Sequence, residues 1–281
     1  MIVTVLMEDT TDSPDLTPEH GLSLHLQFEN RRVLFDTGGS GLFLSNAQKL
    51  GVSMEEVDTL LLSHGHRDHT GGLVPFVTLN RRAPVYLRPE AVGSHYALRP
   101  NGVMEDIGTV IPPEFIPRLC FTESVTRVDE SLTLFSEVEN REFPSPANNV
   151  LFEKKDGPTT SGFVHDPFRH EQNLILTTDG LGVLVTGCAH SGIINIMERF
   201  IALTGRAPDA AFGGFHLMIP SLKDKGANPT DSLDAVARRL ADYPTRYFTG
   251  HCTGSFAFER LRAVLGERVQ PLRTGSVIKD F

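Results

Sequence analysis

The sequence predicts an α/β protein in which two β-sheets carry helices on their outer faces. Two observations lead to this fold class. Short apolar segments typical of strands occur in both halves of the 281-residue chain, and segments with a helical apolar period follow them in each half. With 40% hydrophobic and 22% charged residues, the composition is ordinary for a globular protein. We expect one domain, residues 1–281, with an insertion at about residues 88–167.

The N-terminal segments predict an antiparallel start to the first sheet. Segments rich in β-formers or alternating in polarity occupy residues 2–7, 22–28 and 32–35. A helix is expected over residues 42–50, because Gly51 then supplies a C-terminal stop. Strands are expected at residues 57–62 and 85–87.

Residues 88–167 show a less regular pattern that is rich in proline. Within it, residues 132–135 and 150–152 are expected to be strands. The segment is either an elaboration at the mouth of a site or a plain surface insertion, and its composition does not decide between them.

The C-terminal part returns to a regular alternation of strands and helices. A strand pair across the turn Asp179-Gly180 is expected at residues 173–177 and 182–186. Residues 192–204 have a helical apolar period, and Ser232 is the expected N-cap of a second helix over 232–243. The remaining expected elements are strands at 210–215, 246–249 and 269–272 and a helix at 255–265.

Composition argues against several classes of function. A formal net charge of −9 is unsuited to a nucleic-acid groove, but a small anionic substrate remains open because a metal ion can reverse the local field. Three cysteines are too few for a disulfide framework, so we expect reduced thiols and a cytoplasmic location. Residues 1–9 lack the basic segment of a signal peptide, and no apolar run of 18 residues predicts a membrane span.

The densest group of metal-binding side chains is the run from His64 to His69, which holds three histidines and Asp68. Imidazole and carboxylate groups are good ligands for zinc, iron and manganese. Two histidines two residues apart on a loop can converge on one ion, while Asp68 and His69 can hold a second. A polar turn with surface histidines is the alternative, and it does not account for this density of ligands.

Three further histidines each follow a short apolar strand and a small or aromatic residue: His190, His216 and His251. Strand ends at one edge of a sheet are where α/β folds place ligands. A lone histidine of this kind is more often structural, but three of them beside the histidine run predict a site. His190 and His251 are expected to be ligands, and His216 is left undecided.

These residues resemble the signature of the metallo-β-lactamase superfamily, over a stretch from Asp36 to His251. The resemblance implies a four-layer αββα sandwich of two mixed β-sheets, a metallo-β-lactamase-like fold. It is not specific for a reaction, because that fold hosts many. The residues that carry it are His64-x-His66-x-Asp68-His69, His190 and His251.

A narrower resemblance is to the dihydropteroate-synthase-like branch, which includes synthases of 7,8-dihydropterin-6-methyl-4-(β-D-ribofuranosyl)aminobenzene 5′-phosphate. It is carried by residues 19–23, 186–195, 213–217 and 250–254. This resemblance implies a small substrate that bears a phosphate, with a pterin as one candidate.

The superfamily resemblance also implies the ligands of two metal positions. One position takes His64, His66 and His190, and the other takes Asp68, His69 and His251. Asp36 is implied as a carboxylate that orients ligands, the alternative being an ordinary turn aspartate. One or two divalent ions are expected, zinc first, with iron or manganese as alternatives.

One departure from the superfamily pattern concerns an aspartate that bridges the two metals in many members. The corresponding segment here is Phe212-Gly213-Gly214-Phe215-His216, which has no carboxylate. Equal occupancy of the two positions by metal ions is therefore not expected. His216 then completes one metal position, binds substrate phosphate or donates a proton.

Other candidate residues are weaker. Cys188 and Cys252 each stand next to or near a better-placed histidine, and we expect them to be small buried apolar groups rather than ligands. His20 lies on an early loop, where it either faces the mouth of the site and binds substrate or caps a turn. The remaining histidines receive no role: His25, His95, His165 and His170.

The function expected from these residues is that of a metal-dependent hydrolase or transferase. Metal ions would lower the pKa of a water and supply hydroxide for attack on a phosphoryl or carbonyl centre, with Asp68 and His216 as catalytic residues. An iron-dependent redox or oxygen enzyme of the same fold is the alternative, because histidine-rich sites also suit iron. A nucleic-acid-binding role ranks last because of the acidic charge.

Overall fold

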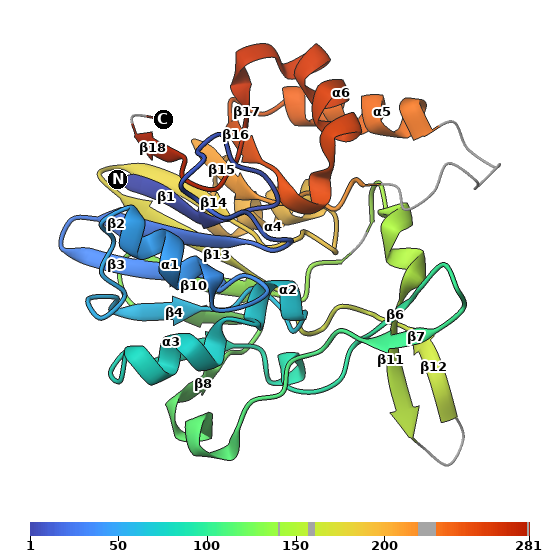
Figure 1. Cartoon of the computed structure of the whole chain (residues 1–281). Helices are drawn as coiled ribbons and strands as arrows, with labels where there is room; N and C mark the ends of the chain where they lie inside the picture. The colour runs from blue at the N-terminus through green and yellow to red at the C-terminus, as the bar shows by residue number, and fades with distance from the viewer. Residues whose placement is uncertain (140, 157–160, 219–228, 280) are drawn as a thin grey trace.

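The computed structural model describes residues 1–139, 141–156, 161–218, 229–279 and 281. Two mixed sheets of seven strands each are stacked face to face, and helices cover both outer faces (Figure 1). The expected four-layer αββα sandwich is confirmed. A smaller, four-stranded sheet stands to one side of this sandwich.

The first sheet begins with antiparallel strands and continues with parallel ones. Strands β1, β2 and β3 form an antiparallel meander, as expected, and β3, β4, β5 and β8 then run parallel. In spatial order the strands are β18 (Val277–Lys279), β1 (Ile2–Met7), β2 (Ser23–Phe28), β3 (Arg31–Phe35), β4 (Thr59–Leu61), β5 (Val85–Leu87) and β8 (Leu119–Phe121).

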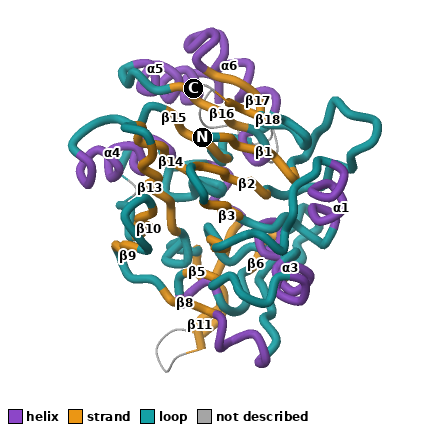
Figure 2. The backbone as a smooth tube through the Cα atoms, turned by 90° about the vertical axis from the view of Figure 1, so that its left-hand side faces the viewer, coloured by secondary structure: helices purple, strands orange, loops and turns teal. Residues whose placement is uncertain are grey.

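The second sheet places three histidine-bearing segments side by side. Strands β14, β15, β16 and β17 are parallel neighbours, with Val185 opposite Phe212 and Phe212 opposite Phe248 (Figure 2). The expected hairpin joins β13 to β14, and Asp179 and Gly180 form its turn with φ angles of 49° and 78°. In spatial order the strands are β17 (Val269–Pro271), β16 (Arg246–Thr249), β15 (Ala210–Gly213), β14 (Leu181–Val185), β13 (Gln172–Thr178), β10 (Leu132–Ser136) and β9 (Val125–Arg127).

Three apolar clusters separate the four layers. One fills the space between the sheets, where Leu24 and Phe35 of the first sheet meet Leu174 and Phe212 of the second. A second packs helices against the outer face of the second sheet, and a third does the same for the first sheet. The amphipathic patterns of strand and helix therefore determine the layer order.

The helices agree with expectation in most places. The α-helices are α1 (Leu42–Lys49), α2 (Arg67–Thr70), α3 (Leu73–Leu79), α4 (Ile193–Thr204), α5 (Pro229–Ala241) and α6 (Ser255–Leu265). Short 3₁₀ helices are η1 (Pro89–Ala91), η2 (Pro113–Arg118), η3 (Pro146–Val150), η4 (His251–Thr253) and η5 (Gly266–Arg268). None of the described helices has the length and apolarity that crossing a membrane requires.

Two expectations about helices were wrong. Ser232 is not an N-cap, because α5 begins three residues earlier at Pro229, and proline is well suited to a first helical turn. Helices α2 and α3 were not expected at all. The run from His66 to Thr70 has no apolar period, and α3 is too short for a period to stand out.

Residues 88–167 contribute to all three sheets. Strand β8 joins the first large sheet, and β9 and β10 join the second. The third sheet consists of β12 (Ser161–His165), β11 (Leu151–Asp156), β6 (Tyr96–Leu98) and β7 (Met104–Asp106). Only this part of the range lies outside the sandwich, while the division into domains remains a prediction.

Candidate metal centre

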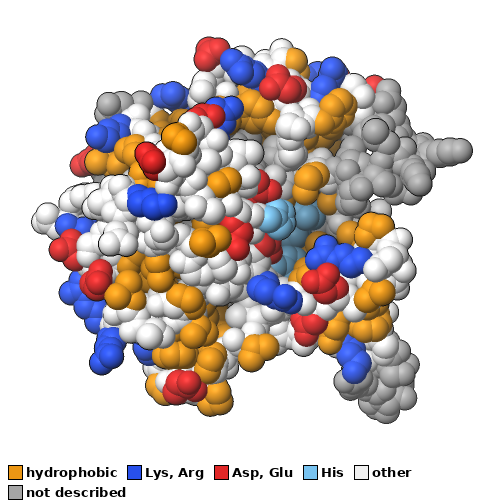
Figure 3. Space-filling model, viewed as in Figure 1, with side chains coloured by type: hydrophobic (Ala, Val, Ile, Leu, Met, Phe, Trp, Pro, Cys, Tyr) orange, Lys and Arg blue, Asp and Glu red, His pale blue; other side chains and the backbone are white. Residues whose placement is uncertain are grey.

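The histidine run follows the C-terminal end of β4 and enters α2. His64 and His69 are fully buried, and His66 is 4% exposed. Asp68 keeps 24% of its side chain exposed and is therefore partly open to solvent. Figure 3 shows histidine side chains at the bottom of a hollow on this face, with acidic and basic side chains around it.

Asp36 holds the run in place from the end of the neighbouring strand β3. Its backbone is in the left-handed region, with φ of 59°, and its carboxylate is fully buried. One carboxylate oxygen, Oδ1, accepts the backbone N–H of Ser63 at 2.7 Å, and Oδ2 lies 2.7 Å from Nδ1 of His69. The carboxylate therefore fixes the ring of His69 so that Nε2 faces the centre of the site.

Strands β14, β15 and β16 bring the other histidines to the same edge. Because the three strands are parallel neighbours, the segments after their C-terminal ends meet there. Two buried glutamates fix these segments. Glu171 Oε1 accepts the backbone N–H of His190 at 2.5 Å, and Glu8 Oε1 accepts that of His251 at 2.6 Å.

The first group of rings is formed by His64, His66 and His190. Their ring centroids lie 4.6 to 4.9 Å apart. His64 Nδ1 contacts the Ser63 hydroxyl at 2.8 Å, and His190 Nδ1 contacts Asn148 Oδ1 at 3.2 Å. This leaves the two Nε2 atoms facing each other at 3.3 Å.

The second group is formed by Asp68, His69 and His251. Nε2 of His251 lies 3.2 Å from Nε2 of His69 and 3.2 Å from Oδ2 of Asp68. The third separation, His69 Nε2 to Asp68 Oδ2, is 3.5 Å. Nδ1 of His251 contacts Asp9 Oδ1 at 2.7 Å, so a carboxylate orients this ring as well.

The environment lowers the pKa of the three histidines in the first group and raises the pKa of His251 in the second. Burial lowers the pKa of His64, His66 and His190 well below the usual imidazole value, which leaves them in the form that binds a metal. Burial also acts to lower the pKa of His251, but its hydrogen bonds to Asp68 and Asp9 outweigh burial and raise it well above that value.

The second group fits a divalent cation, whereas in the first group His64 and His190 lie together and His66 groups instead with His95, Asp166 and His170. Four ligands at about 2.0–2.3 Å from one tetrahedral ion lie roughly 3.3–3.7 Å from one another. The separations of 3.2 to 3.5 Å among Asp68, His69 and His251 are close to that range. Each ring with a hydrogen-bonded Nδ1 offers its Nε2, as is usual for metal-binding histidines. The structure thus brings five of the six expected ligands into the two groups, and His66 lies beside His64 and His190 with its ring centroid 4.6 Å from that of His64.

A third group, which the sequence analysis missed, lies behind His66. His95, Asp166 and His170 are all buried, and Asp166 Oδ2 lies 3.3 Å from His95 Nδ1 and 3.1 Å from His170 Nε2. Gly65 N–H donates to His170 Nδ1 at 3.1 Å, which ties the group to the histidine run. One ring nitrogen of His66 lies within 4.8 Å of the ligand atoms of all three residues, and His66 Nε2 has no hydrogen-bond partner. In sequence these residues carried one signal, the four-residue spacing of Asp166 and His170.

The less certain candidates all lie near the centre. His20 is 59% exposed at the mouth, where Nδ1 contacts Asp9 at 2.8 Å and the ring centroid lies 4.6 Å from that of His251. His216 has an unusual left-handed backbone with φ of 47°, and its ring is 4.2 Å from that of His190. Both ring nitrogens of His216 lack a hydrogen-bond partner.

The three cysteines are free thiols, and Cys188 and Cys252 are buried as expected. However, the reason for excluding Cys188 as a ligand was wrong. It does not lie on a strand, because β14 ends at Val185, and its sulfur is 3.1 Å from His69 Nε2.

Comparison with known proteins agrees with this geometry. The family model of the metallo-beta-lactamase superfamily matches residues 16–251, which include the strands from β2 to β16 and every candidate ligand. The chain belongs to the metallo-β-lactamase superfamily. Membership in this superfamily agrees with divalent-metal binding at the His/Asp cluster, although it does not identify the metal.

Two relatives cover nearly the full length of this superfamily member. One is a 7,8-dihydropterin-6-methyl-4-(β-D-ribofuranosyl)-aminobenzene-5′-phosphate synthase of Methanocaldococcus jannaschii, 27% identical over 93% of this chain and 90% of the relative. The other is the crystal structure of a metal-dependent hydrolase of the β-lactamase superfamily. It is 28% identical, has a TM-score of 0.79 and is matched over 100% of this chain and 99% of that one.

A more distant structure shares the fold alone. Zn²⁺-bound PqqB from Methylobacterium extorquens is 12% identical to this metallo-β-lactamase superfamily chain, with a TM-score of 0.53 over 99% of this chain and all of that one.

Proposed function

We propose that the protein is a metal-dependent hydrolase, or a transferase, that acts on a small phosphate-bearing substrate. The observation that carries this proposal is the convergence of four imidazole Nε2 atoms from two sheets. Nε2 of His64 lies 3.3 Å from Nε2 of His190, and Nε2 of His69 lies 3.2 Å from Nε2 of His251. Rings held this way are preorganised for cations rather than for one another. Zinc is the first candidate, in one or two copies.

Divalent ions at these positions would supply Lewis acidity and lower the pKa of a nearby water. The side chains of the protein would orient that water and transfer protons. Asp68, which is partly open to the hollow, would accept a hydrogen bond from the attacking water and keep it in line. His216, with two unpartnered ring nitrogens beside His190, would move a proton to or from the substrate.

A groove beside His190 supports a small polar substrate. It has a volume of about 310 Å³, and its lining includes Asn148, Asn149 and Phe168. Asn148 hydrogen-bonds His190, and the Phe168 ring stacks on the His190 ring with their centroids 4.5 Å apart. The groove therefore adjoins the centre. Side-chain amides suit a ring with hydrogen-bonding edges, such as the pterin in the name of the Methanocaldococcus relative.

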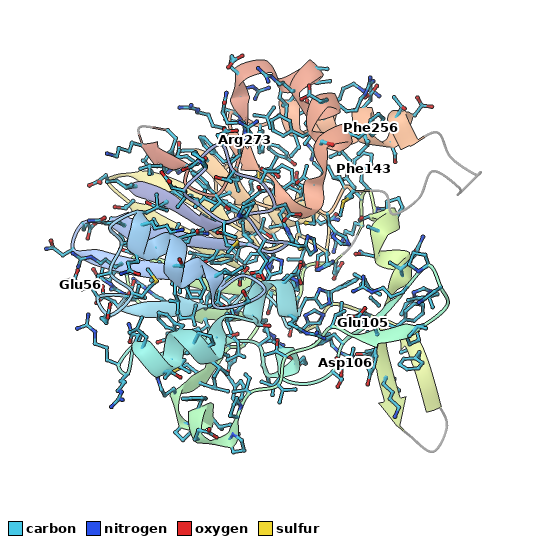
Figure 4. The ribbon with its side chains drawn as sticks, in the orientation of Figure 1. Glu56, Glu105, Asp106, Phe143, Phe256 and Arg273 are labelled. Carbon is cyan, nitrogen blue, oxygen red and sulfur yellow. The ribbon has the colours of Figure 1, made fainter. Side chains whose placement is uncertain are left out.

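Arg67 supports the phosphate part of the proposal. It is an exposed cation between His66 and Asp68 in the histidine run. Its guanidinium donates to the backbone carbonyl of Asp106, which Figure 4 labels beside Glu105 near β7. A guanidinium has five donors, so it retains capacity for a phosphate oxygen. His20, exposed at the mouth, is proposed as a second contact to substrate.

The decisive test removes one ligand at a time. His66→Ala and His190→Ala should each lose bound metal, measured by elemental analysis of the purified protein, together with activity on a panel of phosphomonoesters, phosphodiesters, thioesters and lactones. His165→Ala is the matched control for bound metal only, because His165 belongs to none of the metal-binding groups among the described residues. Its exposed ring stacks on Phe152 and lines the proposed substrate groove, so its activity does not serve as a control.

Unchanged metal content in both ligand variants would show that the assignment of the site is wrong. The same elemental analysis of the unsubstituted protein distinguishes zinc from iron. Iron as the native metal, together with oxygen-dependent turnover, would favour the redox alternative.

A further inference from the structure

Cys188 lies between the two ligand groups, where a bridging carboxylate would be expected from the superfamily pattern. The Cys188 sulfur is buried and belongs to both ligand groups at once. It is within 4.8 Å of the ligand atoms of Asp68, His69 and His251, and equally of those of His64 and His190. Among the described residues, it is the one side chain that the two groups share.

The local backbone explains how Cys188 reaches this point. The chain leaves β14 after Val185 and bends at Ala189, which has a left-handed φ of 57°. Cys188 and His190 stand on the two sides of this bend, and their side chains meet in one group with His64. The sulfur then lies 3.1 Å from His69 Nε2.

The neighbouring strand cannot supply a carboxylate instead. A Cβ on Gly214 would stand 2.4 Å from the Cys252 sulfur, and a Cβ on Gly213 would stand 2.0 Å from the carbonyl oxygen of Thr186. Both glycines thus pack directly against the segment that carries Cys188 and against Cys252. Side chains at these two positions are excluded by contact, and a bridging group has to come from elsewhere.

We propose that the Cys188 thiolate is a shared ligand of both metal positions and takes the place of the bridging carboxylate. The second group then has four protein ligands, Asp68, His69, His251 and Cys188, whose ligand atoms all lie within 4.8 Å of one another. On binding, the thiol releases its proton to solvent and the sulfur donates an electron pair to each ion. This inference rests on the proposed metal centre.

Cys252 is not the shared ligand. Its sulfur donates to the backbone carbonyl of Cys188 at 3.6 Å, and it groups with Cys188 and His216 rather than with the histidines of either metal position. Cys120, on β8, is half-buried and belongs to none of the metal-binding groups among the described residues. The chain therefore supplies two cysteine controls.

The experiment uses the full-length protein loaded with Co²⁺. We expect a thiolate-to-cobalt charge-transfer absorption in the near ultraviolet in the unsubstituted protein, in Cys120→Ser and in Cys252→Ser, and its loss in Cys188→Ser. Bound cobalt is counted in each sample by elemental analysis. Persistence of the band in Cys188→Ser, or its loss in Cys252→Ser alone, would overturn the inference.

A second measurement needs no variant and covers the case in which Cys188→Ser does not fold. X-ray absorption of the zinc-loaded protein should show a sulfur scatterer at about 2.3 Å. A shell of nitrogen and oxygen alone would exclude a cysteine ligand while leaving the proposed metal centre intact. Failure of the unsubstituted protein to bind zinc or cobalt would instead contradict the proposed function itself, so the two failures are distinguishable.

Discussion

Single side chains in this centre are oriented by hydrogen bonds before any ion arrives. His69 and His251 each contact a carboxylate through Nδ1, Asp36 and Asp9 respectively, and His64 contacts a hydroxyl. Such partners fix the ring orientation and raise the basicity of the metal-facing nitrogen. The energetic consequence is that little side-chain freedom remains to be lost on metal binding.

Asp166 provides a direct test of this idea at the level of one residue. A single oxygen of Asp166 contacts both His95 and His170, behind His66. In Asp166→Asn the negative charge that orients both rings is lost, and we expect metal affinity to fall about 10–100-fold without loss of the fold. Competition with a chelator of known affinity measures the change.

Asp234→Asn is the matched control, because Asp234 forms an ion pair with Arg260 on the surface, remote from the centre. Surface pairs of this kind contribute little to stability because solvent screens them, and the control should bind metal normally. Equal affinities in Asp166→Asn and the unsubstituted protein would assign the buried group behind His66 a purely structural role.

At the scale of elements, the centre depends on close contact between strand ends of the two sheets. Gly187 follows β14, and Ser63 follows β4 on the opposite sheet. A Cβ on Gly187 would stand 2.1 Å from the Ser63 hydroxyl oxygen and 3.0 Å from His64 Nδ1. The absence of a side chain at Gly187 is therefore a condition for the position of the first ligand.

Gly187→Ala should consequently displace Ser63 and His64. Overpacking of this kind costs typically about 1–3 kcal/mol, which urea unfolding would measure, and metal affinity should fall as well. Gly182→Ala, on β14 itself, is the control. Its added Cβ would approach only the far end of Arg206, at 3.3 Å, and the Phe200 ring, at 3.5 Å. Similar losses in both variants would mean that the contact with Ser63 is not the cause.

Sequence patterns predicted the elements that carry long periods or dense motifs. Helix α4 was expected because Ile193, Met197 and Phe200 recur on one face, and the structure buries all three. Helix α2 could not be expected, because its four residues are polar and show no apolar period. Contacts with the rest of the protein stabilise its helical conformation. One of these contacts is the backbone hydrogen bond from Arg67 to Ile107.

The same contrast holds for the centre. The ligand set followed from a local motif plus strand-end histidines, whereas Asp9, His95 and Asp166 carry no spacing that links them to it. They meet through tertiary packing across 71 residues for the pair His95 and Asp166, and across 242 for Asp9 and His251. The ligand role proposed for Cys188 was not expected from sequence, because it depends on where β14 ends and on one left-handed residue, Ala189.

At the scale of the whole molecule, the centre joins the two halves of the sandwich. The first sheet supplies His64 through His69 after β4, and the second sheet supplies His190 and His251 after β14 and β16. Ions bound among these side chains therefore cross-link two sheets whose other contacts are mainly apolar. Metal binding should act on the stability of the entire fold rather than on one loop.

Removal of metal by a chelator should then lower the melting temperature of the whole protein in a single transition. A ligand present at roughly 100 times its dissociation constant stabilises the folded state by about 2.7 kcal/mol. For a chain of this size that corresponds to a shift on the order of 5–10 °C, seen by calorimetry and reversed by added zinc. His66→Ala, which lacks a proposed ligand, should show a smaller chelator-dependent shift. If the chelator leaves the melting temperature unchanged although metal is removed, the ions do not hold the two sheets together.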